Sequence, residues 1–211
     1  MKTKASIRVM VVDDHPAFRK GLTALIESEP GLSVVAQAGD GREAIECFRQ
    51  TRPDVVLMDL RLPVLSGVEA IMAIRKEFPE SRFIVVTTYD TDEDIYRAVQ
   101  AGAQSYLLKD MTDEELVGTI RAVHAGQPCL PPGLASRLAE RLRREDLTPR
   151  ETEVLELLVK GRSNKEIAQT LFLTEDAIKF RIKGLFTKLG VQDRTEAVIA
   201  ALRLGIVHLD Y

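Results

Sequence analysis

The sequence predicts a two-domain protein, in which a doubly wound α/β domain with a five-stranded parallel sheet precedes a small all-α domain of four helices. Along the front half, short apolar runs rich in β-branched residues alternate with amphipathic stretches of helical period. The last third of the chain shows only the apolar periodicity of helices and residues typical of helix caps. A proline-rich segment separates the two patterns. These three observations define the expected fold class.

The five strands are expected where apolar runs are bounded by polar breaks, and a helix is expected after each strand. The strands are 7–12, 34–38, 55–58, 83–86 and 105–108, and the helices are near 16–28, 42–51, 67–78, 92–101 and 113–124. Strands that alternate with helices imply a parallel sheet covered by helices on both faces.

A linker is expected after the fifth helix. Residues 127–133 contain three prolines and cannot continue a helix, and a basic helical stretch over 134–144 follows. We therefore expect a first domain over residues 1–125, a linker with a short helix over 126–146, and a second domain over 147–211.

The second domain is expected to contain four short helices. The first helix is expected to begin with Thr148 as its N-cap. Pro149 then lies in the first turn and Glu151 at the third helical position. Gly161 ends this helix. Further caps are expected at Ser163, at Thr174 and at either Asp193 or Thr195, and the third helix is expected to run to Leu189. With a tight turn at 172–173, this set looks like a helix-turn-helix domain.

Length and composition agree with this organisation. The chain has 211 residues, of which 45% are hydrophobic and 29% are charged, as in ordinary soluble globular proteins. Two cysteines, Cys47 and Cys129, are too few for a disulfide scaffold or a four-thiolate zinc site. The apolar run at the N-terminus is too short for a secretory signal, and none approaches the roughly 20 residues of a membrane helix. We expect a cytoplasmic protein with no membrane partner.

Charge is divided unevenly along the chain. The net charge of −3 combines −5 over residues 1–125 with +1 over 126–146 and +1 over 147–211. Between residues 160 and 188, seven basic residues stand against three acidic ones. An acidic front half and a locally basic rear segment indicate two domains with different partners.

Polar side chains gather at the expected carboxyl edge of the sheet, where functional groups collect in open α/β folds. Asp13 and Asp14 end the first strand, Asp59 the third, Thr87 the fourth and Lys109 the fifth. Three carboxylates repel one another unless a cation, an ammonium or raised pKa values compensate. Hard oxygen ligands suit Mg²⁺, and Lys109 and Thr87 supply a charge and a donor for phosphoryl oxygens. The pattern predicts a site that receives a phosphoryl group on a carboxylate.

The motifs of the two halves resemble those of one family. Residues 11–15 (VVDDH), 57–63 (LMDLRLP), 86–89 (VTTY) and 106–110 (YLLKD) resemble the flavodoxin-like receiver domain of response regulators. Residues 147–151 (LTPRE), 163–168 (SNKEIA), 188–191 (KLGV) and 194–197 (RTEA) resemble the LuxR-type helix-turn-helix. Together they resemble the NarL/FixJ family over nearly the whole chain.

The resemblance implies a role for each matching residue of the receiver. Asp59 is the implied phosphoacceptor. The implied Mg²⁺ ligands are Asp13, Asp14, Asp59 and the backbone carbonyl of Arg61. The resemblance further implies that Thr87 is the switch hydroxyl, Tyr106 the switching aromatic and Lys109 the phosphoryl-binding lysine. A simple core role for Tyr106 stays open. His15, next to Pro16, is expected to start a helix rather than to act as a catalytic base.

The third helix of the second domain has an unusual solvent face. At 100° per residue, its apolar positions (Ile178, Ile182, Leu185 and Leu189) fall within about 60° of arc. The opposite face carries Asp176, Lys179, Phe180, Lys183, Gly184 and Thr187. Such a face suits a helix in the major groove, with lysines for guanine edges or phosphates and the phenyl ring against a thymine methyl group. A charged face that only keeps the helix soluble is the alternative.

The expected partner is double-stranded promoter DNA. The expected contacts are phosphate contacts at helix starts, from Ser163, Asn164, Lys165 and Thr174, and groove contacts from Lys179, Phe180, Lys183 and Thr187. The chain departs from the LuxR-type pattern twice, with IKFR at 178–181 where a Val-Lys-x-His run is usual, and with Gly184 where Asn is usual. Both departures bear on which DNA sequence is preferred.

A homodimer is expected on activation, because one helix-turn-helix offers few base contacts. The last helix, over 194–204, carries Ala197, Val198, Ala201 and Leu202 at helical spacing. Val198 and Leu202, four residues apart, are candidates for a twofold seam. Packing into the domain's own core is the alternative.

The expected function is that of a transcriptional regulator of a two-component system, not an enzyme. A histidine kinase would phosphorylate Asp59 with Mg²⁺ and so change dimerisation and DNA binding. A flavodoxin-like catalyst is disfavoured, because the acidic turn at Asp13 and Asp14 repels a nucleotide phosphate. Acyl-homoserine-lactone sensing lacks support, because the front half matches a receiver. A phosphorylation-independent regulator whose receiver only dimerises stays open.

Overall fold

The structure is a computed structural model that describes residues 6–88, 91–127, 130–143 and 145–207. Within these residues the chain forms five strands and ten helices. It divides into two compact units, the first made of residues 1–90 and 94–135 and the second of residues 91–93 and 136–211. Cys129 and positions 89 and 144, which the sequence interpretation used, lie outside the described residues.

All five expected strands form one parallel sheet. The strands are β1 (Ile7–Val12), β2 (Leu32–Ala38), β3 (Val55–Met58), β4 (Phe83–Thr87) and β5 (Ser105–Leu108), in the order β2-β1-β3-β4-β5. Val9 of β1 lies opposite Val34 on one side and Val55 on the other. The predicted doubly wound α/β fold is confirmed, with β2 beginning two residues earlier than expected and β4 including Thr87.

The five expected helices of the first domain are present. They are α1 (Pro16–Ser28), α2 (Gly41–Thr51), α3 (Gly67–Glu77), α4 (Asp92–Ala101) and α5 (Asp113–His124). Their bounds agree with the expected ones to within one residue, since local signals set the helix starts. The side chains of Asp40, Ser66 and Thr112 accept hydrogen bonds from the first turns of α2, α3 and α5.

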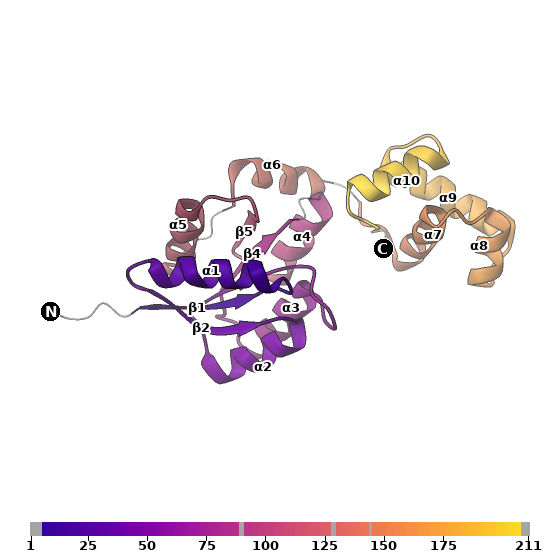
Figure 1. Cartoon of the computed structure of the whole chain (residues 1–211). Coiled ribbons are helices and arrows are strands. Elements are labelled where there is room, and N and C mark those ends of the chain that lie inside the picture. The colour runs from indigo at the N-terminus through magenta and orange to yellow at the C-terminus, as the bar shows by residue number, and fades with distance from the viewer. Residues whose placement is uncertain (1–5, 89–90, 128–129, 144, 208–211) are drawn as a thin grey trace. The chain divides into compact units, whose positions relative to one another are not determined.

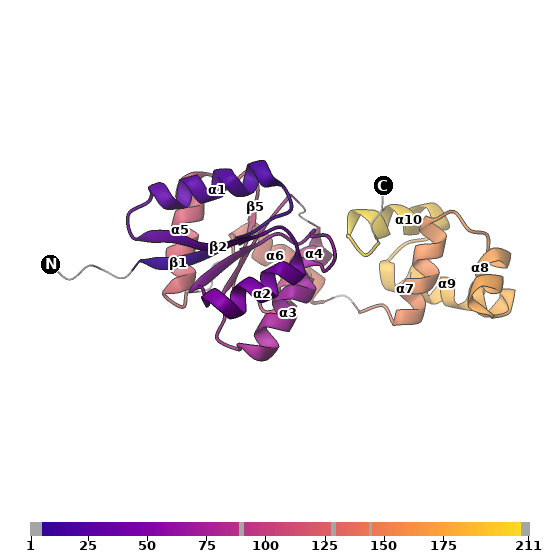
Figure 2. The same cartoon turned by 60° about the horizontal axis from the view of Figure 1, so that its bottom comes forward.

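Helices cover both faces of the sheet, as Figures 1 and 2 show. Val9 and Val11 of β1 pack in one core with Leu22 of α1 and Leu116 of α5. Because side chains alternate along a strand, Met10 between them points to the opposite face, where α2, α3 and α4 lie. Burial on both faces explains why the strands read as nearly continuous apolar runs.

The second domain consists of four helices with the expected caps. They are α7 (Pro149–Val159), α8 (Asn164–Leu171), α9 (Glu175–Leu189) and α10 (Arg194–Arg203). Thr148 and Ser163 form capping boxes with Glu151 and Glu166, and the side chain of Thr174 accepts from the Ala177 amide. Of the two candidates for the last cap, Asp193 is the one used.

The helix-turn-helix is formed by α8 and α9. Phe172 ends α8 in the left-handed conformation, with a φ of 56°, and its side chain is 94% exposed. Leu155 of α7, Ile167 of α8, Ile178 of α9 and Ala201 of α10 pack together in one core. This core fixes the direction of α9 relative to the other three helices.

The linker helix α6 (Pro132–Arg141) begins two residues earlier than expected. Proline is favourable in the first turn of a helix, where its missing N–H is not needed, so the proline-rich segment ends inside the helix rather than before it. Neither α6 nor any other helix in the described part of the chain has both the length and the apolar character needed to cross a membrane.

Candidate functional site

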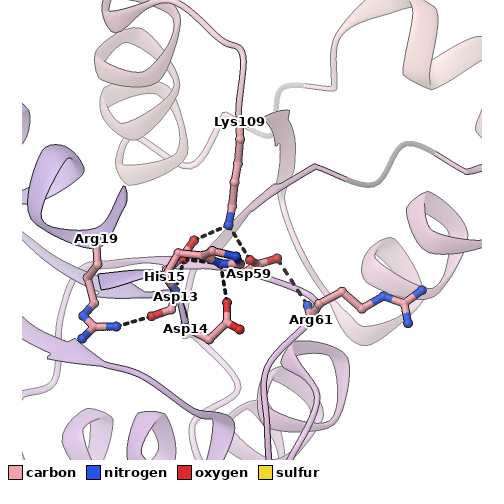
Figure 3. A network of polar contacts seen from close by, with 7 residues as sticks. All are labelled: Asp13, Asp14, His15, Arg19, Asp59, Arg61 and Lys109. Carbon is pink, nitrogen blue, oxygen red and sulfur yellow. Dashed lines mark hydrogen bonds and ion pairs between the residues drawn. The ribbon is translucent and has the colours of Figure 1, made fainter. Parts of the chain in front are cut away.

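Charged groups from three strand ends meet at one place on the sheet edge, drawn in Figure 3. Asp13 follows β1, Asp59 follows β3 and Lys109 follows β5. The Asp59 amide donates to the Val12 carbonyl at 3.0 Å, and the Lys109 amide donates to the Thr87 carbonyl at 2.9 Å. These bonds continue the sheet pairing past the strand ends and hold the functional side chains on a rigid backbone.

The Lys109 ammonium lies between two buried carboxylates. Its Nζ is 2.6 Å from Oδ2 of Asp13 and 2.6 Å from Oδ2 of Asp59. The side chains of Asp13 and Asp59 are only 2% and 4% exposed, so water screens these ion pairs weakly. Burial lowers the pKa of Lys109, but the hydrogen bonds and negative charges of both carboxylates outweigh it, and the pKa is raised. The Phe18 ring, centred 4.7 Å from Nζ, adds a cation–π contact.

Asp14 and His15 form the more open side of the same cluster. His15 Nδ1 is 2.6 Å from Oδ1 of Asp14, and the His15 amide donates to Oδ1 of Asp13 at 2.8 Å. Arg19 holds the turn by donating to the Asp13 carbonyl. One ligand atom each from Asp13, Asp14, His15 and Asp59 lies within 4.8 Å of the others. The sequence interpretation treated His15 only as a helix start; its place directly after two aspartates was the available signal.

The loop after Asp59 is held close to the β3 backbone. The Arg61 amide donates to Oδ1 of Asp59 at 3.3 Å, and the Gly67 amide donates to the Leu60 carbonyl at 3.0 Å. A Cβ atom on Gly67 would meet the Asp59 backbone, so only glycine fits where α3 starts. The sequence interpretation did not single out this glycine.

Thr87 and Tyr106 are both fully buried. Thr87 is the last residue of β4, next in the sheet to β5, where Tyr106 lies. Because Leu107 belongs to the core shared with α1 and α5, Tyr106 points to the other face, toward α2, α3 and α4. Thr87 therefore lies at the carboxyl edge with the acidic cluster, while Tyr106 lies in the layer beneath it.

The acidic cluster has the composition of a divalent-cation site. The carboxylates of Asp13, Asp14 and Asp59 stand against one ammonium, from Lys109, which leaves an excess of negative charge. Hard carboxylate oxygens that converge on a partly open position match the ligand preference of Mg²⁺. A buried carboxylate beside a lysine also suits phosphoryl chemistry, since the ammonium is placed to meet incoming phosphoryl oxygens.

In the second domain, α9 presents the face expected from its sequence. Ile178 and Leu185 are buried, and all six residues of the expected solvent face are exposed, namely Asp176, Lys179, Phe180, Lys183, Gly184 and Thr187. Lys179 Nζ is 3.0 Å from Oδ1 of Asp176, but both side chains are well exposed, so this ion pair is weak. The lysines are therefore available to an external phosphate or base.

Two of the four residues expected to contact phosphate at helix starts, Ser163 and Thr174, carry hydroxyls, and both hydroxyls cap a helix. Ser163 Oγ donates to a Glu166 carboxylate oxygen at 2.7 Å, so a phosphate contact from this hydroxyl requires that bond to exchange. Thr174 caps α9 and is exposed, as is Lys165, whereas Asn164 is half-buried.

An ion pair that the sequence interpretation missed joins the end of α9 to the start of α7. Lys188 Nζ is 2.9 Å from Oε2 of Glu151 and 3.3 Å from the Asp146 carbonyl. Glu151 is also the capping-box residue of α7, so one carboxylate ties two helices together. The partners are 37 positions apart in the sequence, so no local pattern reveals this pair.

The last helix offers two half-buried apolar residues and one exposed one. Ala197 and Ala201 belong to the core, while Val198 and Leu202, the expected seam residues, are half-buried. Ile199, which the sequence interpretation did not name, is 58% exposed.

Comparisons with known proteins match both halves of the chain. Residues 9–121 match the response regulator receiver domain, and residues 145–201 match the bacterial regulatory proteins of the LuxR family. The transcriptional regulatory protein LiaR of Bacillus subtilis is 39% identical over 210 residues, which cover 96% of this chain and all of LiaR. The response regulator protein VraR of Staphylococcus aureus is 34% identical over 207 residues, 96% of this chain and 99% of VraR.

Solved structures agree with these matches. The response regulator ChrA of a heme-sensing two-component system has a TM-score of 0.58 and 36% identity, covering 96% of this chain and 100% of ChrA. The complex of the two-component response regulator RcsB with DNA has a TM-score of 0.68 and 25% identity, covering 92% of this chain and 97% of RcsB.

The fold and the acidic site together define a receiver joined to a helix-turn-helix, the class of two-domain regulators of transcription. This chain belongs to the two-component response regulators of the NarL/FixJ type, which join a receiver domain to a LuxR-type DNA-binding domain.

Proposed function

We propose that phosphorylation of Asp59 by a histidine kinase controls DNA binding by this response regulator. The observation that carries the proposal is the Lys109 ammonium, 2.6 Å from both Asp59 and Asp13. Asp59 is almost fully buried and its negative charge is balanced by a group that can turn to new oxygens. Phosphoryl transfer depends on such positioning and charge stabilisation.

In the proposed step, a carboxylate oxygen of Asp59 attacks the phosphorus of a phosphohistidine on the kinase. The P–N bond breaks, its electron pair stays on the imidazole nitrogen, and an acyl phosphate forms on Asp59. Lys109 moves from the Asp59 carboxylate to a phosphoryl oxygen while it keeps its ion pair with Asp13. The Thr87 hydroxyl donates to another phosphoryl oxygen.

Mg²⁺ is the proposed cofactor. The carboxylates of Asp13, Asp14 and Asp59 and the backbone carbonyl of Arg61 would hold it. When bound, the ion neutralises the charge on the phosphoryl oxygens during transfer. The excess of negative charge in the cluster, with three carboxylates against one ammonium, supports this assignment.

The proposed switch couples this site to the face of the sheet that carries α4. Thr87 moves toward the phosphoryl group, and Tyr106 fills the space that Thr87 leaves. The burial of both side chains on adjacent strands supports the proposal, because a packed layer that loses one group must rearrange. The surface around α4 and β5 changes as a result.

The proposed output is binding of a homodimer to double-stranded promoter DNA. The contacts come from Ser163, Asn164, Lys165, Thr174, Lys179, Phe180, Lys183 and Thr187, and Val198 and Leu202 form the seam between DNA-binding domains. The DNA complex of the related RcsB supports this partner. We propose residues 1–125 as the receiver, 126–146 as the linker and 147–211 as the DNA-binding domain.

The same proposal includes a cytoplasmic location and no catalytic activity beyond the acceptance of the phosphoryl group. The free thiol of Cys47 and the match to regulators of transcription support it.

The experiment that tests the function combines phosphorylation with selection of DNA. Wild type and Asp59→Asn are incubated with acetyl phosphate or with beryllofluoride and Mg²⁺, and the modified chain is used to select duplexes from a random pool. We expect wild type to be modified and to enrich a sequence, and Asp59→Asn to remain unmodified. Full modification of Asp59→Asn would overturn the assignment. Equal DNA selection with and without modification would point instead to a phosphorylation-independent regulator.

A further inference from the structure

The glycine in the middle of α9 is not required by the fold. A Cβ atom on Gly184 would meet nothing within 4 Å. Gly184 is also not one of the described glycines that have a positive φ angle. Glycine disfavours a helix interior relative to alanine, because it loses more backbone freedom on folding. Packing and backbone geometry therefore do not explain this glycine, and its place beside Phe180 on the exposed face of α9 sets it apart from Gly118 in α5, which meets nothing either.

Phe180 lies one helical turn before Gly184 on the same exposed face of α9. Its side chain is 80% exposed, so it contributes little to the core of its own domain. Residues at i and i+4 are neighbours on a helix surface, so Phe180 and the bare backbone at position 184 border the same stretch of exposed surface. We use the term notch for the exposed apolar surface made by the Phe180 ring and the bare helix backbone at Gly184.

The surroundings of the notch favour DNA over an apolar protein partner. Lys179 and Lys183, which adjoin Phe180 and Gly184 in the sequence, are exposed on the same face of α9. Lysines beside a contact surface meet phosphates or guanine edges. An apolar patch bordered by lysines fits DNA, because the major groove presents an apolar base substituent between negatively charged phosphates.

We propose that the notch formed by Phe180 and Gly184 reads the 5-methyl group of a thymine in the major groove. This inference rests on the proposed DNA-binding function. The thymine methyl is the apolar group that the major groove presents, and glycine lets the helix backbone approach a base edge closely. The missing side chain at position 184 is then a determinant of sequence preference, not a defect of the helix.

The first test removes the methyl group from the DNA. The full-length chain, modified with beryllofluoride, selects duplexes from a random pool, and each thymine of the selected duplex is then replaced by uracil. We expect one position per half-site at which wild type loses about three- to tenfold in affinity, the order expected for one buried methyl group. Phe180→Ala should bind the thymine duplex more weakly and lose the discrimination against uracil at that position.

The second test uses opposite effects on folding and binding. Gly184→Ala should raise the unfolding midpoint of the DNA-binding domain by about 3–7 °C, since alanine favours a helix and has room there. The same variant should bind the selected duplex about tenfold more weakly, because the new methyl group occupies the notch. Gly118→Ala in α5, another exposed glycine with nothing within 4 Å, is the matched control and should leave DNA affinity unchanged.

The outcomes separate this inference from the function on which it rests. If wild type selects no duplex, DNA binding itself is wrong. If wild type selects a duplex but no uracil replacement changes its affinity, or if Gly184→Ala binds as tightly as wild type, the thymine-reading notch is wrong and DNA binding stands.

Discussion

A Cβ atom placed on Gly67 would overlap the backbone carbonyl oxygen of Asp59. The start of α3 therefore packs directly against the backbone of the proposed phosphoacceptor. The atom in the way belongs to the main chain of a buried residue, so it cannot swing aside as a flexible side chain would. Gly67 thus fixes the distance between α3 and the loop that holds Arg61.

Gly67→Ala is expected to destabilise the receiver by about 1–3 kcal/mol, the usual cost of forcing an extra methyl group into a packed site. It should also slow phosphorylation, because the Asp59 backbone must shift to relieve the contact. Urea unfolding and acetyl phosphate labelling measure the two effects. Gly118→Ala, where an added Cβ meets nothing, should not destabilise the receiver, and equal behaviour of the two variants would contradict the packing argument.

Lys109→Met is expected to destabilise the receiver by about 3–5 kcal/mol in the absence of divalent ions, because two buried carboxylates lose their shared counter-charge. Mg²⁺ should restore part of this stability by supplying positive charge at the same place. Asp14→Ala is the matched control, since it removes negative charge and should leave the fold intact while the response to Mg²⁺ disappears. Urea unfolding with and without Mg²⁺ checks both variants, and a Lys109→Met chain as stable as wild type would refute the prediction.

The ion pair between Lys188 and Glu151 predicts acid sensitivity of the DNA-binding domain. Burial raises the pKa of Glu151, but hydrogen bonds from Thr148 and Lys188 outweigh it, and the pKa lies below its ordinary value of 4.5. A lowered folded-state pKa means that the stabilisation is complete above the unfolded-state value of 4.5 and is lost as pH falls through the folded-state pKa.

Glu151→Gln should therefore flatten the acid side of the stability profile, measured as the unfolding midpoint of this domain between about pH 3 and 7. Lys188→Met should lower the midpoint at neutral pH. Arg150→Met removes an exposed pair with Glu153 instead and should change stability by less than about 0.5 kcal/mol. An unchanged acid limb in Glu151→Gln would show that other carboxylates dominate.

Lys179 and Lys183 predict a salt-dependent contribution to DNA binding. If both contact phosphates, replacing both with alanine should reduce the slope of log affinity against log salt by about two and weaken all sequences equally. If one contacts a base, specificity at one position should relax by about 1–3 kcal/mol instead. Titrations at several salt concentrations distinguish these results. Lys20 and Lys76, exposed in the receiver, provide the matched double variant, and equal losses in both doubles would mean that α9 does not enter the groove.

Phosphorylation is expected to couple the receiver to the DNA-binding domain. Beryllofluoride should raise the mass of the chain toward that of a dimer in light scattering and strengthen binding to the selected duplex at least tenfold, which takes about 1.4 kcal/mol. Asp59→Asn should show neither change. A wild-type chain whose mass and affinity both stay the same on modification would leave the phosphorylation-independent regulator as the better description.

Most of the fold follows from patterns that act over short distances. Short apolar runs and helical patterns place the strands and helices of the receiver to within one or two residues, and caps such as Ser163 and Asp193 set helix starts in the second domain. The acidic site could also be anticipated, because the carboxyl ends of parallel strands meet at one edge. The start of α6 was misplaced because proline both breaks a helix interior and suits a first turn.

The remaining features depend on the path of the folded backbone and not on a local sequence pattern. The pairing of Lys188 with Glu151 and the approach of Gly67 to the Asp59 carbonyl exist only once the domains are packed. The place of His15 beside Asp14 depends on the path of one turn, which a local pattern does not specify. The sequence could show which residue types were present but not these distances.

The parallel sheet has a consequence for the kinetics of folding. Each pair of neighbouring strands is separated along the chain by at least one helix, and Val9 must find Val55 before β1 and β3 can pair. Closing such long loops costs chain entropy before any contact compensates, whereas the four short helices of the second domain meet close neighbours. After dilution from denaturant, the helix-turn-helix should regain its structure before the receiver does. During synthesis the receiver leaves the ribosome first, although it folds more slowly. It can complete its sheet while the rest of the chain is still being synthesised.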